Sequence, residues 1–275
     1  MKIFDISLDK LRYVDFFKTI TRFEKQNIVF TPNPEILLQT NTDLGFKQLL
    51  QKAQYLTPDG IGLYIAFQIL DTKIPIRLIK FKSLYRIALL PLYFFNLFFR
   101  KSQLYQKYWE RICGSDLTKD LLYYSEAQNA PITIIDLYNP TDANKVASQA
   151  KFSEKLQAEF PELKFDYIIY NPEKKTEILE QIKTSDSKIL FSTLWMKKQE
   201  QSVVDIMEYC PNIKLWLWIG SSFDYFIGFQ KRAPKIFCSL GLEWFYRIFT
   251  WPQKIKRLKR IYNAIFVFLY KVITQ

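Results

Sequence analysis

Four short apolar segments decide the fold: ITIIDL (residues 132–137), FDYIIY (165–170), KILFST (188–193) and IKLWLWI (213–219). Their β-branched and aromatic residues predict buried strands. Helix-compatible stretches separate them, including residues 143–160 and 197–209. Strands that alternate with helices pair in parallel through right-handed crossovers. The sequence therefore predicts an α/β fold, with a Rossmann-like parallel sheet flanked by helices.

The predicted sheet extends towards the N-terminus. Residues 27–31 predict a further strand. Three helical segments follow it, at about 34–40, 46–54 and 60–70. No internal repeat or Gly/Ser-rich linker divides the chain, although its composition changes near Pro252. We therefore expect an α/β domain over residues 1–245 and a basic, amphipathic helical appendage over residues 246–275.

The composition narrows the class of protein. Hydrophobic residues make up 49% of the 275 residues, which is enough for a buried core. The formal net charge of +12 favours an anionic partner and leaves nucleic acid, a membrane surface and a diphosphate open. The three cysteines lie far apart, and the first residues lack the pattern of a signal peptide. We therefore expect neither disulfides nor a zinc site, and a protein that stays in the cytoplasm.

The chain contains no histidine. Histidine is the usual general base near neutral pH, so acid–base chemistry would fall to carboxylates. The sequence also lacks an Asp-x-Asp pair, which many sugar-nucleotide transferases use to hold a divalent metal against a diphosphate. We therefore expect chemistry that needs no metal and no cofactor.

Two apolar segments with basic flanks differ from the rest of the sequence, which has the pattern of a soluble protein. Residues 87–99 are mostly apolar but fall short of the roughly 20 residues that a transmembrane helix needs. We expect them to belong to a membrane-proximal insertion at about residues 76–104. From Lys254 onward, apolar residues recur at near-helical spacing and basic residues crowd the first turns, as in an interfacial helix. The alternative is a terminal helix that packs its apolar stripe on the domain.

Two motifs stand just before predicted helices. The first is Thr31-Pro32-Asn33-Pro34-Glu35, and the second is Thr57-Pro58-Asp59-Gly60. Each is compatible with a capped helix start, with Asn33 or Thr57 as the N-cap and a proline in the first turn. That interpretation explains every residue of the second motif except Gly60.

A longer ordered string occupies the last third of the chain. It runs from Ser221-Ser222-Phe223-Asp224 through Gly228 and Arg232-Ala233-Pro234 to Gly241-Leu242-Glu243-Trp244-Phe245-Tyr246-Arg247. This string resembles the C-terminal signature of the WecG/TagA/CpsF glycosyltransferases. Further elements similar to those of the family precede it in order: Thr31-x-Asn33-x-Glu35, Pro58-Asp59-Gly60, Arg111-x-x-Gly114-x-Asp116-Leu117 and Gln199-Glu200. The resemblance extends from Thr31 to Arg257.

The resemblance implies a function at the inner face of the cell membrane. Such an enzyme would be peripheral to an anionic membrane surface and would transfer a sugar from a UDP-sugar to a polyprenyl-diphosphate-linked acceptor. It would act in surface-polysaccharide or teichoic-acid synthesis. By family frequency, the donor would be UDP-N-acetylmannosamine and the acceptor an N-acetylglucosaminyl-diphosphate-polyprenol. UDP-glucose, UDP-mannosaminuronate or another UDP-hexose stays open as the donor. The protein could also form a homo-oligomer.

The same resemblance assigns roles to individual residues. Asp59 would be the general base that deprotonates the acceptor hydroxyl for inverting attack, and Thr31 would orient a hydroxyl beside it. The remaining candidates would bind the substrates: Asn33, Arg111, Gln199, Glu200, Asp224, Arg232, Arg247, Lys254 and Arg257. The last three would bring positive charge over the active site from the appendage.

The chain also departs from the family pattern. Residues 136–140 and 218–222 stand where the family commonly has glycine-rich turns, so side chains restrict close approach by a nucleotide. Lys254 replaces an arginine, which keeps the charge but loses the bidentate geometry. The stretch between Asp59 and Arg111 is longer than in the family, and we predict that residues 87–99 within it form a second membrane contact near the acceptor entrance.

Two alternatives from other classes follow. The replaced glycines are compatible with a catalytically inactive membrane-assembly subunit that keeps the fold. The net charge and abundant aromatic residues are compatible with a nucleic-acid-binding protein, but the chain lacks an RNP-like element and its cations cluster beside apolar runs. We therefore expect no nucleic-acid partner.

Overall fold

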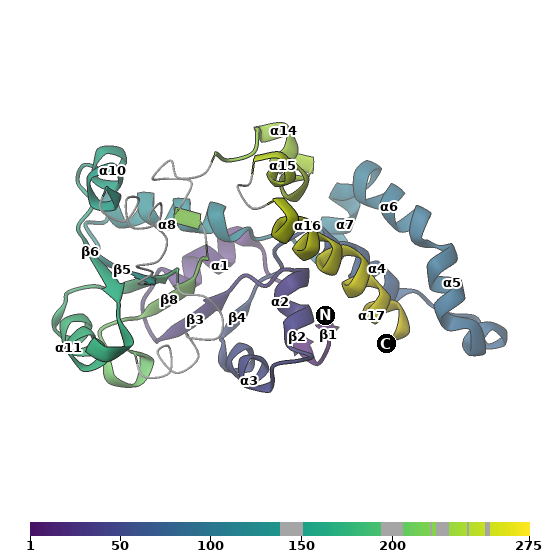
Figure 1. The fold of residues 1–275 in the computed structure, drawn as a ribbon, viewed down its shortest axis with the longest axis horizontal. Helices are drawn as coiled ribbons and strands as arrows, with labels where there is room; N and C mark the ends of the chain where they lie inside the picture. The colour runs from purple at the N-terminus through teal and green to yellow at the C-terminus, as the bar shows by residue number, and fades with distance from the viewer. Residues whose placement is uncertain (138–150, 194–205, 221, 224–230, 241, 251–253) are drawn as a thin grey trace.

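A computed structural model gives the structure of the chain and describes all residues except 138–150, 194–205, 221, 224–230, 241 and 251–253. A six-stranded sheet forms its centre, in the order β4-β3-β8-β7-β5-β6, and every neighbouring pair is parallel (Figure 1). The strands are β3 (Asn27–Phe30), β4 (Tyr55–Leu56), β5 (Ile132–Leu137), β6 (Phe165–Tyr170), β7 (Ile189–Ser192) and β8 (Leu215–Trp218). The predicted Rossmann-like α/β fold is confirmed.

The predicted strands are present, and three of the five are shorter than predicted. All five predicted strands form, and two of them, β5 and β6, have the expected bounds. The short strand β4 and the antiparallel pair of β1 (Lys2–Ile3) and β2 (Ile6–Ser7) were not predicted. Each of these has two residues, which is too few to show the alternation that identifies a strand.

Helices cover both faces of the sheet, because its apolar side chains alternate between two cores. Trp216 and Trp218 of β8 face one core, whereas Leu215 and Leu217 face the other. The first core includes side chains of α2 (Pro34–Gln39), α3 (Leu44–Lys52), α4 (Gly62–Asp71) and α11 (Lys175–Thr184). The second includes α1 (Tyr13–Ile20), α8 (Gly114–Ala127) and α10 (Phe152–Glu159).

The predicted helices form where the structure describes them. The segments at 34–40, 46–54 and 60–70 become α2, α3 and α4, with ends shifted by one or two residues. Helix α10 occupies the second half of the segment at 143–160, whose first half lies outside the described residues. Most of the segment at 197–209 also lies outside them.

The predicted insertion is helical and lies at one end of the molecule, beside the C-terminal helices (Figure 1). It consists of η1 (Ile76–Phe81), α5 (Lys82–Ala88), α6 (Leu90–Phe99) and α7 (Lys101–Tyr108). The C-terminal part consists of α14 (Lys235–Leu240), α15 (Glu243–Thr250), α16 (Lys254–Tyr262), a π-helical stretch (Asn263–Val267) and α17 (Phe268–Thr274). Among the residues described, none of the helices combines the length and the hydrophobicity that crossing a membrane requires.

The packing alternative is confirmed for the last helix, whereas an interfacial role of α16 stays a prediction. In α17, Phe268, Leu269, Val272 and Ile273 are buried in the first core, so this end packs on the domain. The first part is different, because Ile255 of α16 is 85% exposed. The division of the chain at residue 245 stays a prediction.

Candidate active site

The candidate catalytic residues follow two adjacent strands of the sheet. Thr31 comes directly after β3, and Asp59 lies in the turn after β4. Strand β4 lies at the edge beside β3, whereas the strands that come later in the chain lie on the other side of β3. Ligands of open parallel sheets bind at the carboxyl ends of the strands, where the strand order reverses. The two residues therefore occupy the position at which this fold class binds substrates.

The turn that carries Asp59 is tied to the segment after β3. The Thr57 N–H donates to the Phe30 carbonyl at 3.0 Å, and the Asp59 N–H donates to the Pro32 carbonyl, also at 3.0 Å. Gly60 follows with a φ of +101°, a conformation that side chains disfavour. Helix α4 begins only at Gly62, so the interpretation of Thr57 as its N-cap is wrong. These contacts hold Asp59 next to the Thr31 segment.

The other capping interpretation is confirmed. Asn33 precedes α2, and its Oδ1 accepts a hydrogen bond of 3.0 Å from the Ile36 N–H, with Pro34 in the first turn. Asn33 therefore starts a helix directly beside the candidate site. Its role in binding substrate stays a prediction.

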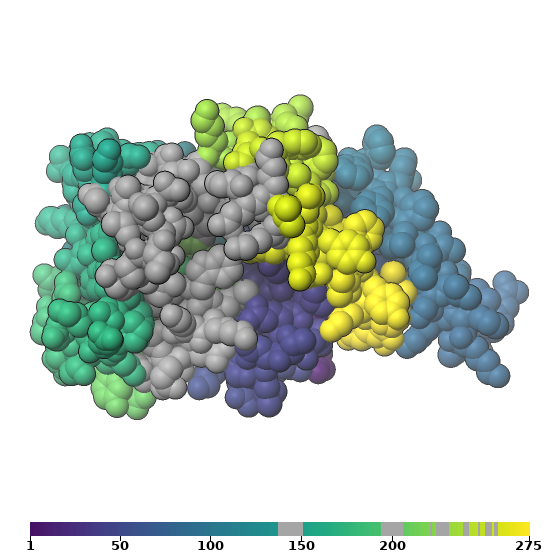
Figure 2. All heavy atoms as spheres, in the orientation of Figure 1, coloured from purple at the N-terminus to yellow at the C-terminus, as the bar shows by residue number. Residues whose placement is uncertain are grey.

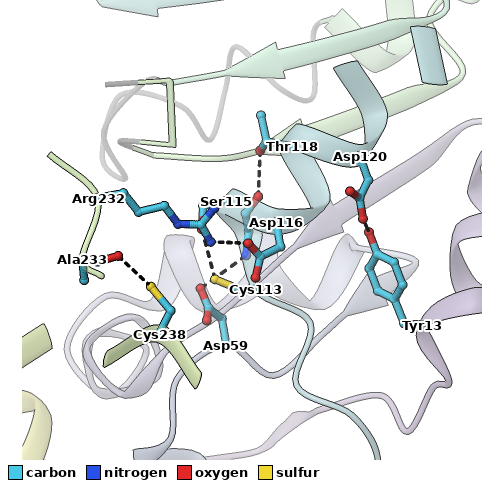
Figure 3. A network of polar contacts seen from close by, with 11 residues as sticks. Tyr13, Asp59, Cys113, Ser115, Asp116, Thr118, Asp120, Arg232, Ala233 and Cys238 are labelled. Carbon is cyan, nitrogen blue, oxygen red and sulfur yellow. Dashed lines mark hydrogen bonds and ion pairs between the residues drawn. The ribbon is translucent and has the colours of Figure 1, made fainter. Parts of the chain in front are cut away.

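The start of helix α8 lies against both catalytic candidates, and Figure 3 shows Asp59 beside it. The Gly114 N–H donates to Asp59 Oδ2 at 3.5 Å, and the positive end of a 14-residue helix favours a carboxylate there. A Cβ at Gly114 would lie only 2.7 Å from Thr31 Oγ1. The glycine thus lets the helix approach Thr31 and Asp59 together.

The C-terminal part of the chain adds a charged side chain to the start of α8. The Arg232 guanidinium forms an ion pair with Asp116 in the first turn of α8 and donates to Ser115 Oγ at 3.4 Å. The Cys238 thiol donates to the Ala233 carbonyl at 3.3 Å, which fixes the turn that follows Arg232. Residues more than a hundred positions apart in the sequence therefore meet at the start of α8.

Arg111 supplies a charge that persists across the physiological pH range. The Tyr64 hydroxyl donates to the Trp109 carbonyl at 3.0 Å and so positions the segment that leads to Arg111. Burial lowers the pKa of Arg111, but the opposing field of Asp59 and its anionic neighbours outweighs burial, and the net pKa is raised. Burial, reinforced by Asp59, raises the pKa of the Cys113 thiol to about 12. Cys113 is therefore a neutral thiol and unsuited to act as a nucleophile.

Glu243 joins this cluster, although its sequence motif assigned it no role. It lies at the start of α15. Burial raises the pKa of its carboxyl, as does the charge of Asp59, while Arg232 and Arg111 oppose the shift. The available signal was an acidic residue directly before the aromatic run Trp244-Phe245-Tyr246. The cluster thus holds three carboxyl groups and two guanidinium groups.

A comparison with known families decides the assignment of the chain. The sequence model of the glycosyl transferase WecG/TagA/CpsF family matches residues 1–88 and 98–275. The chain belongs to the WecG/TagA/CpsF family. Its members are glycosyltransferases of cell-surface polysaccharide synthesis, and the family implies a nucleotide-sugar donor and a lipid-linked acceptor. The resemblance noted in the sequence is confirmed.

Only some of the predicted site residues of this WecG/TagA/CpsF protein can be placed. Thr31, Asp59, Arg111 and Arg232 surround the start of α8, as described above. Gln199, Glu200 and Asp224 lie outside the described residues. Arg247 belongs to α15, and Lys254 and Arg257 belong to α16, but their side chains are not among those described. The substrate-binding roles of these six residues stay predictions.

Arg260 is an additional cation that the sequence did not single out. Its guanidinium binds Glu35 through two hydrogen bonds of 2.7 and 3.0 Å. Glu35 lies in the first turn of α2, next to the Asn33 cap. This bidentate pair fastens α16 of the WecG/TagA/CpsF chain beside the Thr31 segment.

One departure from the family pattern has a structural explanation. Asp136, which stands near an expected glycine-rich turn, is buried at the end of β5. Its carboxylate accepts a hydrogen bond of 2.8 Å from the Tyr167 hydroxyl and another from the Thr193 hydroxyl. Asp136 therefore links β6 and the end of β7 to β5.

Proposed function

We propose that this protein is an inverting, metal-independent glycosyltransferase in which Asp59 is the general base. The donor would be UDP-N-acetylmannosamine, and the acceptor an N-acetylglucosaminyl-diphosphate-polyprenol. One observation carries the proposal: Asp59 and Thr31 meet at the start of α8, with Gly114 in contact with both. The choice of donor and acceptor rests on the family and not on the geometry.

The arrangement supports a single displacement. Asp59 takes the proton of the acceptor hydroxyl as its oxygen bonds to the anomeric carbon, with Thr31 orienting a hydroxyl beside it. The bond between the anomeric carbon and the diphosphate oxygen breaks, and its electron pair leaves with UDP. Attack opposite the leaving group inverts the anomeric configuration. No covalent intermediate on the protein is required.

The diphosphates require fixed positive charge, and guanidinium groups suit phosphate oxygens. Arg111 stays charged, as its raised pKa indicates. The Arg232 side chain is about one third exposed even while it is paired with Asp116. We assign Arg111 and Arg232 to the diphosphates, together with Arg247, Lys254 and Arg257 of the C-terminal helices.

Metal independence is tested on the enzyme. Among the described residues, no group of three or more Cys, Asp and Glu side chains is arranged to hold a metal ion. The first experiment therefore measures UDP release in EDTA, with a panel of UDP-sugars and a short-chain lipid-diphosphate-GlcNAc acceptor. Acceptor-dependent release in EDTA supports the proposal, whereas release that requires added Mg²⁺ or Mn²⁺ overturns metal independence.

The variant Asp59→Asn tests the base. Loss of a general base typically costs about 10²- to 10⁴-fold in rate, so we expect kcat to fall within that range. Asp166→Asn, on an exposed position of β6, is the matched control and should retain the wild-type kcat. Unchanged turnover in Asp59→Asn would reject the assignment of the base. If folded wild-type protein released no UDP from any donor, the inactive-subunit alternative would gain support.

A further inference from the structure

The predicted insertion has an unusual charge pattern. Between Asp71 and Glu110 the sequence holds eight Lys and Arg residues and neither Asp nor Glu. We call residues 76–100, which form η1, α5 and α6, the arm. The family match leaves out residues 89–97, which belong to α6 and its approach. The rest of the arm lies within the family match, so residues 89–97 are the part of the arm that the family does not explain.

The outer surface of the arm is apolar. Ten of its large apolar side chains are exposed: Ile76, Ile79, Phe81, Leu84, Ile87, Leu92, Phe94, Phe95, Phe98 and Phe99. Ile76 is 88% exposed and Phe99 is 74% exposed. Figure 2 shows the arm projecting at one end of the molecule. Large apolar side chains that gather exposed on one segment indicate an interaction site.

The inner surface of the arm is fixed to the domain. Tyr93 and Leu97 of α6 are buried in the first core. The buried Gln68 of α4 donates to the Tyr93 carbonyl at 3.2 Å and accepts from the Asn96 side chain at 2.9 Å. Helix α6 therefore has its protein partner already, and its exposed phenylalanines lie on the remaining surface.

The arm is also joined to the C-terminal helix. Arg86 of α5 is buried, and its Nη1 donates to the Ile273 carbonyl at 2.9 Å. Lys82 donates to the Gln275 carbonyl at 3.2 Å. Both cations thus meet the negative end of α17, where carbonyl groups lack helical partners. These contacts fix the orientation of the arm relative to the C-terminal helix.

We propose that the arm is a lipid-binding element that inserts its exposed side chains into the interface of an anionic bilayer. Apolar residues flanked by cations fit such a surface, since the apolar groups enter the acyl boundary and the cations meet lipid phosphates. A second copy of the chain would oppose two acid-free, basic arms, which repel each other. Charge therefore favours an anionic lipid surface over self-association.

Vesicle sedimentation without substrates tests the proposal, so its result does not depend on the transferase assignment. The probes are vesicles of phosphatidylcholine alone and of phosphatidylcholine with 30% phosphatidylglycerol. We expect Phe98→Ser/Phe99→Ser to bind the anionic vesicles at least tenfold more weakly than wild type. The matched control is Val14→Ser/Leu44→Ser, which changes two exposed apolar residues outside the arm and should bind like wild type.

A second variant tests how much the cations of the arm contribute to vesicle binding. Arg77→Gln/Lys80→Gln removes two exposed cations of the arm, for which no ion pair is described. Binding to anionic vesicles should fall about fivefold per cation, and binding to phosphatidylcholine should stay the same. Equal binding of both arm variants and wild type would overturn the proposal. So would a dimer in analytical ultracentrifugation that Phe98→Ser/Phe99→Ser converts to monomer without changing vesicle binding.

Discussion

At the scale of single residues, the site depends on the absence of a side chain at Gly114. A Cβ there would lie 2.7 Å from Thr31 Oγ1, so Gly114→Ala must displace Thr31 or the start of α8. Misplacing a positioning group by about 1 Å can cost about 10²-fold in rate. We therefore expect kcat to fall between tenfold and a hundredfold, as measured by UDP release.

The matched control for that substitution is Gly45→Ala. Gly45 is exposed in the first turn of α3, where alanine in place of glycine lowers the conformational entropy of the unfolded chain. This variant should keep the wild-type kcat and resist urea slightly better. If Gly114→Ala also kept the wild-type kcat, Thr31 would have no positioning role.

Glu243 should make the stability of the protein depend on pH. Burial raises its pKa, aided by Asp59, so the folded state holds this proton more tightly than the unfolded state does. As pH rises above about 4.5, the folded state therefore loses stability through this group. Glu243→Gln has no carboxyl group that can lose this proton. Its free energy of unfolding, minus that of wild type, should therefore increase from pH 4 to pH 7.

Urea unfolding at several pH values measures this difference. Glu154→Gln, at an exposed position of α10, controls for the loss of one carboxylate. Its free energy of unfolding should follow the wild-type pH dependence. A constant difference between Glu243→Gln and wild type at all pH values would contradict the assigned environment of Glu243.

Sequence reasoning found those site residues that belong to short linear motifs. Asp59, Arg111 and Arg232 were named from their motifs, and the structure gathers them at the start of α8. Glu243 was not assigned to the site, because the charges that shift its pKa come from residues 59, 111 and 232. Such neighbours are created by the fold, and no local spacing in the sequence indicates them.

At the scale of whole elements, the sequence predicted the existence of the longer strands and helices better than their ends. Long apolar runs identify β5 and β6, whereas a Thr-Pro-Asp-Gly sequence that looks like a helix start is a turn before α4. The hydrogen bonds from Thr57 and Asp59 to the β3 side of the site explain this difference. The hydrogen bonds to the segment after β3 therefore decide the conformation of the Thr-Pro-Asp-Gly sequence, and its local preference for a helix N-terminus does not.

The ion pair between Glu35 and Arg260 connects helix α16 to helix α2. Both side chains are about one quarter to one third exposed, so we expect the bidentate pair to contribute about 1 kcal/mol. Arg260→Leu should accelerate amide hydrogen exchange in α16 while exchange in β5 stays unchanged. A double-mutant cycle with Glu35→Gln measures the coupling, and additive effects of the two substitutions would contradict it.

At the scale of the whole molecule, the positive charge is distributed unevenly. The net charge is +12, and eight of the 39 basic residues fall in the acid-free stretch between Asp71 and Glu110. The C-terminal helix lies beside this stretch and adds the basic first turns of α16 (Figure 1). Charge of one sign at one end of a protein orients it on an anionic surface.

Salt should therefore separate membrane association from chemistry. Raising the ionic strength from 0.1 to 1 M shortens the Debye length from about 10 Å to about 3 Å, which screens exposed cations far more than buried ones. We expect turnover of an acceptor embedded in anionic vesicles to fall at least tenfold, and turnover of a short-chain acceptor in solution to fall much less. Because Arg111 is half-buried and lies in the field of Asp59, salt screens its charge less than that of the exposed cations. Equal losses with both acceptors would place the salt-sensitive step in the active site and not at the membrane.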